Sequence, residues 1–215
     1  MKARVAVLIS GAGTNMAALL YAAKAASCPY EIVLVTGDNP DAPGFAIAEA
    51  EGITVARLPK PAPKDKAQFF AALDAQIRKA GAEFVALAGF MRILPDDFVR
   101  DWDGRMLNIH PSLLPKYKGL NTHAQASAAG DSHGGCSIHV VTAELDGGPV
   151  LAQTPVAIVP GDAADSLAER VRFAEHQLYP ATLAAFVARE RSPEYLRGRV
   201  RELAMALPEA DEVTS

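Results

Sequence analysis

The chain has 215 residues, half of them hydrophobic, which is enough for one domain that buries a large core. Its 21 Lys and Arg are outnumbered by 25 Asp and Glu, and a net charge of -4 argues against nucleic-acid binding, which needs a basic surface. The N-terminal residues run directly into an apolar strand with no secretory signal, and no apolar run could span a bilayer, so we expect a cytoplasmic protein without a membrane partner.

The N-terminal half alternates apolar strands with helices. A continuous apolar run at 5–9 ends in Ser-Gly-Ala-Gly, and helical spacing follows at 16–20. Further strands are predicted at 31–36, 53–58, 84–88 and 106–109, and further helices at 46–51 and 65–80. This alternation predicts a parallel sheet with right-handed crossovers.

The pattern changes in the C-terminal half. β-rich segments at 138–141 and 150–159 are separated by the turn-like residues 146–149, which predicts an antiparallel extension of the sheet. A long amphipathic helix is predicted at 162–188. The fold class is therefore α/β, a Rossmann-like, mostly parallel sheet flanked by helices, with an antiparallel extension in the C-terminal half.

Three polar residues have complementary roles in acyl transfer. Asn108 and His110 alternate along an apolar strand, so they share the face on which that strand emerges. An amide can donate to a developing oxyanion, a His can move a proton, and an Asp such as Asp146 can orient that His and hold its charge. Each piece taken alone favours an ordinary strand end or turn. Their combination favours a site, because Pro111 and Pro115 stiffen the chain just beyond the pair.

A glycine turn opens the first helix, and a charged pair lies on the last one. Backbone amides and the helix dipole at Gly13, Thr14 and Asn15 predict an anion site, although a tight turn needs small residues as well and the third Gly of a dinucleotide fingerprint is missing. Arg172 and Glu175 are three residues apart and share a helix face, where an exposed ion pair is the alternative. The five histidines and two cysteines lack metal-ligand spacing, so no metal is expected.

Several short segments occur along the chain in the same order as in one known family; they are residues 10–15, 88–94, 108–119, 122–123, 136–141, 144–148, 175–176 and 179–180. This set resembles the folate-dependent formyltransferases, and among them the members that act on glycinamide ribonucleotide. The resemblance extends from the first strand to about residue 186 and is much more specific than one glycine motif.

The resemblance implies an activity and a set of site residues. The implied reaction moves a formyl group from 10-formyltetrahydrofolate, the cosubstrate, to the amine of 5-phosphoribosylglycinamide in de novo purine (IMP) biosynthesis. Asn108, His110 and Asp146 would be catalytic. The implied acceptor-binding residues are Gly13, Thr14, Asn15, Glu175 and Arg172, and the implied folate-binding residues are Lys66, Met91, Arg92, Ile93, Leu94, Asn108 and His139.

Some of these assignments have structural alternatives. Met91, Ile93 and Leu94 could equally belong to the core, and His139 could be a hydrogen-bonded strand histidine. Lys66 aligns loosely with a family Arg beside a proline-rich loop, so a solvated lysine is the alternative.

The expected organisation is one formyltransferase domain over 1–190, with a phosphate-binding half over about 1–100 and a folate-binding, catalytic half over about 101–190. Residues 191–215 would form an extension with a disordered acidic end. The partners would be small molecules, and the protein a monomer or a homodimer. Two alternative functions are a formyltetrahydrofolate hydrolase (deformylase), which would use the same triad on water, and a non-catalytic folate- or nucleotide-binding module.

Overall fold

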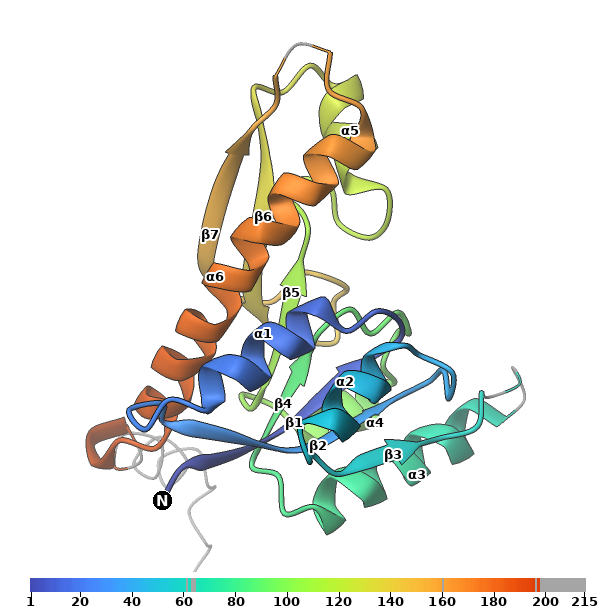
Figure 1. Ribbon diagram of the computed structural model, residues 1–215, viewed down its shortest axis with the longest axis vertical. Coiled ribbons are helices and arrows are strands. Elements are labelled where there is room, and N and C mark those ends of the chain that lie inside the picture. Colours follow the sequence, from blue (N-terminus) through green and yellow to red (C-terminus); the bar gives the residue numbers. More distant parts are fainter. Residues whose placement is uncertain (61, 63–64, 160, 196, 198–215) are drawn as a thin grey trace, which may run out of the picture.

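A twisted sheet forms the centre of the fold in the computed structural model, which describes residues 1–60, 62, 65–159, 161–195 and 197 (Figure 1). Within these residues seven strands form one sheet in the order β3-β2-β1-β4-β5-β6-β7. The strands are β1 (Ala3–Ile9), β2 (Tyr30–Gly37), β3 (Val55–Arg57), β4 (Phe84–Leu87), β5 (Met106–His110), β6 (His133–Val140) and β7 (Val150–Ala157). β1 to β5 pair in parallel, whereas β6 and β7 pair antiparallel, so the predicted fold class is confirmed.

Helices cover both faces of the parallel part of the sheet. The helices are α1 (Thr14–Ala23), α2 (Gly44–Ala50), α3 (Lys66–Lys79), α4 (Asp96–Asp101), α5 (Thr122–Ala128) and α6 (Ala164–Glu190). On β1, Val5, Val7 and Ile9 join the core under α1, α2 and α6, while Ala6 and Leu8 join the core under α3 and α4. Because both faces are covered, β1 has the continuous apolar composition of a buried parallel strand. Each such fully buried side chain stabilises the fold by about 1.5–3 kcal/mol.

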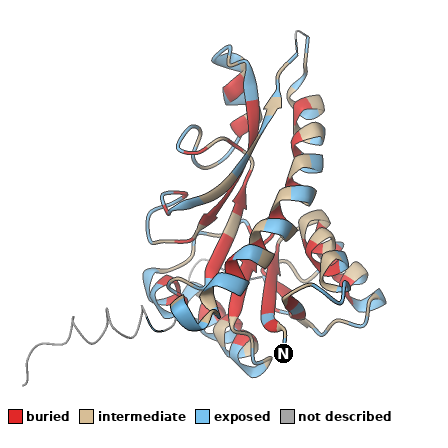
Figure 2. Ribbon diagram, turned by 90° about the vertical axis from the view of Figure 1, so that its left-hand side faces the viewer, coloured by how far each residue is buried: buried red, intermediate tan, exposed pale blue. Residues whose placement is uncertain are grey.

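The molecule is elongated because α6 extends beyond the parallel part of the sheet (Figure 1). The N-terminal half of α6 packs with α5, β6 and β7 in the upper part of the picture, around Cys136, Leu167 and Val171. Its C-terminal half covers the sheet beside α1, with Tyr179 and Leu183 fully buried. Burial is densest where α6 meets the sheet, and it thins toward β7, whose residues alternate between intermediate and exposed (Figure 2).

Most elements were predictable from the sequence. The predicted strands and helices are confirmed with shifts of a few residues at their ends. Helices α4 and α5, of six and seven residues, were not predicted. Within the described residues no helix combines the length and apolarity needed to cross a bilayer. The expected disorder of the acidic end lies outside the described residues.

Candidate active site

The strand order has a switch point at β1, and open α/β sheets commonly bind ligands at the carboxyl ends of the strands beside such a point. The chain proceeds outward from β1 to β2 and β3, then returns to β4 on the other side of β1. Loops that leave neighbouring strands in opposite directions separate at such a switch point and leave room for a ligand. The turn at 10–15 follows β1 and the segment at 88–94 follows β4, so both predicted binding segments lie at this edge.

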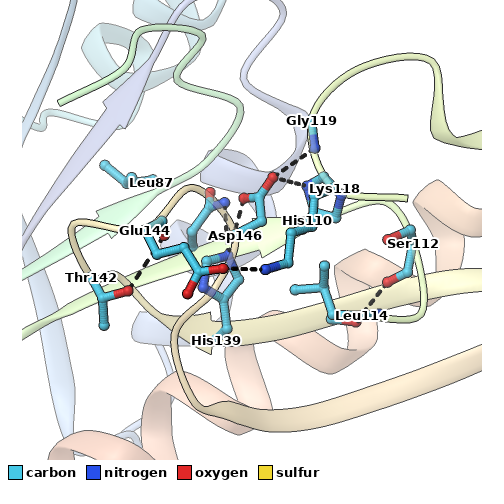
Figure 3. Close-up of polar contacts among 12 residues, drawn as sticks. Leu87, His110, Ser112, Leu114, Lys118, Gly119, His139, Thr142, Glu144 and Asp146 are labelled. Atoms are coloured by element: carbon cyan, nitrogen blue, oxygen red, sulfur yellow. Dashed lines mark hydrogen bonds and ion pairs between the residues drawn. The ribbon is translucent and has the colours of Figure 1, made fainter. Parts of the chain in front are cut away.

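Antiparallel pairing of β5 and β6 assembles the centre of the site. Asn108 lies directly opposite His139, and His110 lies directly opposite Ser137. Residues at alternate positions of paired strands share one face, so these four side chains lie together. Figure 3 shows His110 and His139 both directed toward Asp146, which reaches them from the loop after β6.

His110 is buried and is held by two acceptors. Its Nε2 lies 2.8 Å from the carbonyl oxygen of Tyr117 and therefore carries a hydrogen, because a carbonyl only accepts. Its Nδ1 lies 3.3 Å from Oδ2 of Asp146. Both ring nitrogens therefore face an acceptor, and only the imidazolium form can donate a hydrogen bond on each side.

Asp146 is fixed by contacts from three segments of the chain. Its Oδ2 accepts a hydrogen bond of 2.9 Å from the backbone N–H of Gly119, and its Oδ1 lies 3.5 Å from Nε2 of His139. Burial raises the pKa of Asp146, but hydrogen bonds from His139 and Gly119 and the charge of His110 outweigh burial, so the pKa lies below its ordinary value. The backbone of Asp146 has φ of 47°, a left-handed conformation that Asp tolerates better than most residues.

His139 has two alternative partners at Nε2. Its Nδ1 lies 3.0 Å from the carbonyl oxygen of Val140, so Nδ1 carries a hydrogen. In the neutral ring, Nε2 accepts from the Asn108 amide nitrogen at 3.1 Å; in the protonated ring it donates to Asp146. The neutral form fixes one amide hydrogen of Asn108 and leaves the other for a ligand. Because His110 and His139 contact different oxygens of Asp146, the three groups do not converge on one point, and no three metal-ligating side chains are grouped elsewhere in the described residues.

The turn after β5 is held by polar contacts that the sequence did not reveal. Ser137, fully buried on β6, donates to the carbonyl of Ser112 at 2.6 Å and accepts the N–H of Leu114 at 3.0 Å. Gln153 on β7 donates to the carbonyl of Leu114 at 2.8 Å. These contacts place the following residues, including Tyr117, beside His110. The rigidity predicted from the two flanking prolines is therefore supplemented by hydrogen bonds from two more strands.

An ion pair joins the loops that carry Gly119 and Asp146. Lys118 contacts Glu144 at 2.6 Å, which links the turn after β5 to the loop after β6 (Figure 3). Both side chains are substantially exposed, so this contact contributes little stability, on the order of 1 kcal/mol or less.

The turn after β1 has the geometry of an anion site. Gly13 is the N-cap of α1 at φ of 71°, and no described side chain caps the free amides of the first helical turn. A Cβ at Gly13 would lie 2.8 Å from Cα of Gly44, so this turn requires glycine. The tight turn that needs small residues and the predicted anion site thus occupy the same backbone, and Thr14 and Asn15 are the first two residues of the helix that follows.

Glu175 joins this turn to α6. Glu175 is buried, and its Oε2 accepts a hydrogen bond of 2.8 Å from the side-chain amide nitrogen of Asn15. The amide oxygen of Asn15, Oδ1, is buried without a partner among the described residues. Burial raises the pKa of Glu175, and the Asn15 hydrogen bond and the charge of Arg172 only partly oppose it. The alternative of an exposed ion pair with Arg172 does not hold for Glu175, because its carboxylate is buried against α1.

Two histidines beside Arg172 were not predicted as site residues. Burial, the charge of Arg172 and the charge of His110 all lower the pKa of His123 on α5. Burial and Arg172 likewise lower the pKa of His176, whose Nε2 is buried without a partner in the described part of the chain. Both histidines therefore lie close enough to Arg172 to feel its charge. His176 follows Arg172 by four residues on α6, whereas the proximity of His123 is visible only in the tertiary structure.

The segment after β4 lies on the surface of the molecule, and one of its residues packs against the core. Met91 and Ile93 are 71% and 67% exposed, so the core alternative is wrong for both, whereas Leu94 packs partly buried against the core. Arg92 pairs with Asp38 at 2.7 Å. Lys66, the first residue of α3, has its ammonium 6.0 Å from the ring centre of Phe70 on the same helix.

Comparisons with known proteins assign a family to this geometry. The family described as formyl transferase matches residues 3–183. The phosphoribosylglycinamide formyltransferase of Escherichia coli (strain K12) is 42% identical over 182 residues, which make up 85% of this chain and 86% of that protein. The trifunctional purine biosynthetic protein adenosine-3 of Bos taurus is 43% identical over 182 residues, also 85% of this chain, but the chain spans only 18% of that much longer protein.

Solved structures share the fold. The phosphoribosylglycinamide formyltransferase from Brucella melitensis has a TM-score of 0.82 and 44% identity, over 87% of this chain and 97% of that one. A formyltetrahydrofolate deformylase from Pseudomonas syringae pv. tomato has a similar TM-score of 0.81 but 28% identity, over 88% of this chain and 63% of that one. Backbone similarity alone therefore does not separate formyl transfer from hydrolysis.

Proposed function

The chain belongs to the formyl transferase family, and we propose that it transfers the formyl group of 10-formyltetrahydrofolate to the amine of 5-phosphoribosylglycinamide. The products are the N-formyl compound and tetrahydrofolate, in purine biosynthesis. The observation that carries this proposal is the 2.8 Å hydrogen bond between Asn15 and Glu175. It joins an anion site to the helix that also contacts the catalytic strand, because Tyr179, one turn further along α6, donates to the carbonyl of Leu107 at 3.1 Å.

This connection favours a phosphorylated amine over water as the acceptor. A hydrolase needs the acyl-transfer centre but no anion site for an acceptor. Here the free amides after Gly13, with Arg172 nearby, suit a phosphate, and the buried carboxylate of Glu175 suits the polar groups of the same acceptor. A non-catalytic binding module is disfavoured because binding alone does not require Asp146 to be held against a buried His110.

The proposed chemistry uses three residues. The neutral amine attacks the formyl carbon, and the carbonyl electron pair moves to oxygen. The Asn108 amide donates a hydrogen bond to that oxyanion, and one such donor lowers the barrier by about 3 kcal/mol. The His110 imidazolium, whose two N–H groups face Tyr117 and Asp146, stabilises the oxyanion through its positive charge. Asp146 accepts the proton lost by the attacking nitrogen and passes it, directly or through water, to the departing folate nitrogen as the carbon–nitrogen bond breaks. The carbonyl re-forms and no net proton is consumed.

Exposed apolar side chains suit the flat ring of the donor. Met91 and Ile93 lie after β4, Leu120 follows the residue that binds Asp146, and Leu145 precedes Asp146; all four are exposed. Large exposed apolar side chains in loops at one sheet edge are typical of a ligand surface. We therefore assign the folate to this side, next to Asn108 and His139, with Lys66, Arg92 and Leu94 at its border. We also expect a cytoplasmic monomer or homodimer whose reaction partners are small molecules.

Mixing the protein with 10-formyltetrahydrofolate and glycinamide ribonucleotide tests the proposal directly. We expect tetrahydrofolate and formylated ribonucleotide in equal amounts, and little formate when the acceptor is omitted. Formate production that does not depend on the acceptor would instead identify a hydrolase. Tight binding of both compounds without turnover would identify a binding module.

A further inference from the structure

Asp38 connects three loops at the binding edge of the sheet. It follows β2, and its Oδ1 accepts a short hydrogen bond of 2.5 Å from the hydroxyl of Ser10, the first residue of the turn after β1. Its Oδ2 accepts Nε of Arg92 at 2.7 Å, in the segment after β4. The Ser10 hydroxyl oxygen in turn accepts the backbone N–H of Met91 at 2.8 Å. One carboxylate therefore holds both neighbouring loops.

The local sequence brings this carboxylate into place. Gly37 ends β2 directly before Asp38, and a Cβ there would lie 1.9 Å from the carbonyl oxygen of Ile9, so only glycine allows β2 to lie this close to the end of β1. The next residue, Asn39, donates to the carbonyl of Ser10 at 3.3 Å. The loop after β2 is thereby fastened to the turn after β1 by two successive side chains.

The contact between Asp38 and Arg92 is partly shielded from water, with 11% of the Asp38 side chain and 29% of the Arg92 side chain exposed. Asp38 is 8% exposed, and Arg92 has its guanidinium carbon 5.8 Å from the ring centre of Phe69 on α3. A guanidinium that is paired with a buried carboxylate and stacked on a ring has lost most of its freedom to reach a ligand. Removing one partner of such a pair leaves the other with an uncompensated charge, which disrupts the segment around it.

We propose that Asp38 is a positioning residue that holds the donor-binding segment 91–94 against the anion-binding turn 10–15, so that both substrates meet in one fixed arrangement. This inference rests on the proposed function for the identity of the two ligands. Asp38 does not contact the reacting atoms; it acts through the Met91 amide and the Arg92 side chain. Asn108, His110 and Asp146 belong to other strands and loops, so loss of Asp38 changes ligand affinity and spares the chemical step.

Steady-state kinetics of Asp38→Asn test this role, because the amide can still accept from Ser10 but no longer neutralises Arg92. We expect the KM for 10-formyltetrahydrofolate to rise roughly tenfold, which is the loss of one charged hydrogen bond. The turnover number should change by less than about twofold, since the interaction is made equally before and during the chemical step. Arg92→Met, which keeps packing against Phe69, should match it, and the double variant should be no worse than either single one.

A second measurement does not depend on activity. Hydrogen exchange of the Met91 amide in the ligand-free protein should accelerate in Asp38→Ala, because the Ser10 hydroxyl that accepts this amide loses its anchor. Glu31→Gln is the matched control: it removes a carboxylate paired with Arg4 at the opposite end of the same strand, and should leave both the KM and the Met91 exchange rate unchanged.

The outcomes separate the two proposals. If the wild-type protein transfers no formyl group, the proposed function fails, while Met91 exchange still decides whether Asp38 positions segment 91–94. An unchanged donor KM with unchanged Met91 exchange in the Asp38 variants would overturn the positioning role. A fall in turnover at constant KM would also overturn it, since Asp38 would then act on the chemical step.

Discussion

Two regions at the same sheet edge, proposed for acceptor binding and for the reaction, are built by different physical means. The turn between β1 and α1 consists of consecutive residues whose backbone amides have no side-chain cap among the described residues, and its key residue, Gly13, contributes no side chain. The centre between β5 and β6 is made of side chains from separate segments, with Asn108 and His110 on one strand, His139 on the next and Asp146 on a loop beyond it. The first region depends on backbone conformation, the second on side-chain placement.

This difference has a practical lesson. A substitution that prevents the backbone conformation of a backbone site should lower both the stability of the protein and its affinity for the ligand. A substitution that removes one functional group from a side-chain site should lower the turnover number while the fold is retained. The substitutions below test whether the two regions really behave in these two ways.

Asp146→Asn should have the largest effect. The amide cannot accept and pass on a proton, so turnover should fall roughly a thousandfold, as measured under saturating substrates. Ligand affinities should stay close to those of the wild type. A variant that retains normal turnover would remove Asp146 from the mechanism.

Asp146→Asn should also change the stability of the protein, in a direction that depends on pH. The folded-state pKa of Asp146 lies below its ordinary value, so its charge stabilises the fold above that ordinary pKa, and the contribution is lost as the pH falls through the folded-state pKa. Asp146→Asn should therefore melt at a lower temperature than the wild type near pH 7, and the difference should vanish in strong acid. Thermal unfolding across this pH range checks it.

Asn108→Ala should come next. Removing one oxyanion donor costs roughly a hundredfold in turnover. Because Asn108 also donates to His139, the folate KM should rise slightly while the fold is retained. Single-turnover rates report the chemical step directly, and a near-normal rate would show that the oxyanion takes its hydrogen bonds elsewhere.

Gly13→Ala should lower stability and acceptor affinity, in contrast to the two preceding substitutions, which lower turnover. A left-handed φ and a Cβ 2.8 Å from Gly44 should together cost about 2 kcal/mol of folding free energy. The KM for the phosphorylated acceptor should rise about tenfold as the amides turn away, with little effect on the donor KM. Gly11→Ala is the control, because a Cβ there meets nothing within 4 Å and stability should be kept. Equal stability losses at both positions would contradict the special role of Gly13.

Glu175→Gln should have the smallest effect, and its stability sign is reversed. Burial raises the pKa of Glu175, so its neutral form stabilises the fold below the ordinary pKa, and that benefit is lost as the pH rises through the folded-state value. At pH 7 the variant should be at least as stable as the wild type, although the acceptor KM should rise several-fold as a charged hydrogen bond is lost. A lower melting temperature at pH 7 would show that the buried charge is better compensated than its partners indicate.

The two regions differ in how much of each could be predicted from the sequence. The first strand, glycine turn and helix are local in sequence, so 5–20 was correctly predicted as one structural unit, while the anion site there stays a prediction. Asn108 and His110 were also predictable as neighbours on one face, because strand periodicity is a property of adjacent residues. Met91 and Ile93 were left open between core and ligand surface, because an apolar residue in a loop has no periodicity to report its burial.

The sequence by itself determined the order of strands and helices, the glycine turn and the alternation along β5, because each depends on residues a few positions apart. Tertiary structure alone decided that the Tyr117 carbonyl and Asp146 meet at His110, that Glu175 reaches Asn15 across 160 residues, and that Asp38 lies between Ser10 and Arg92. These contacts join segments that are distant in the chain, and the physical reason is the same for all of them. The side-chain partners of a residue depend on which strands pair and which helix covers them, and that choice is made by burial over the whole sheet.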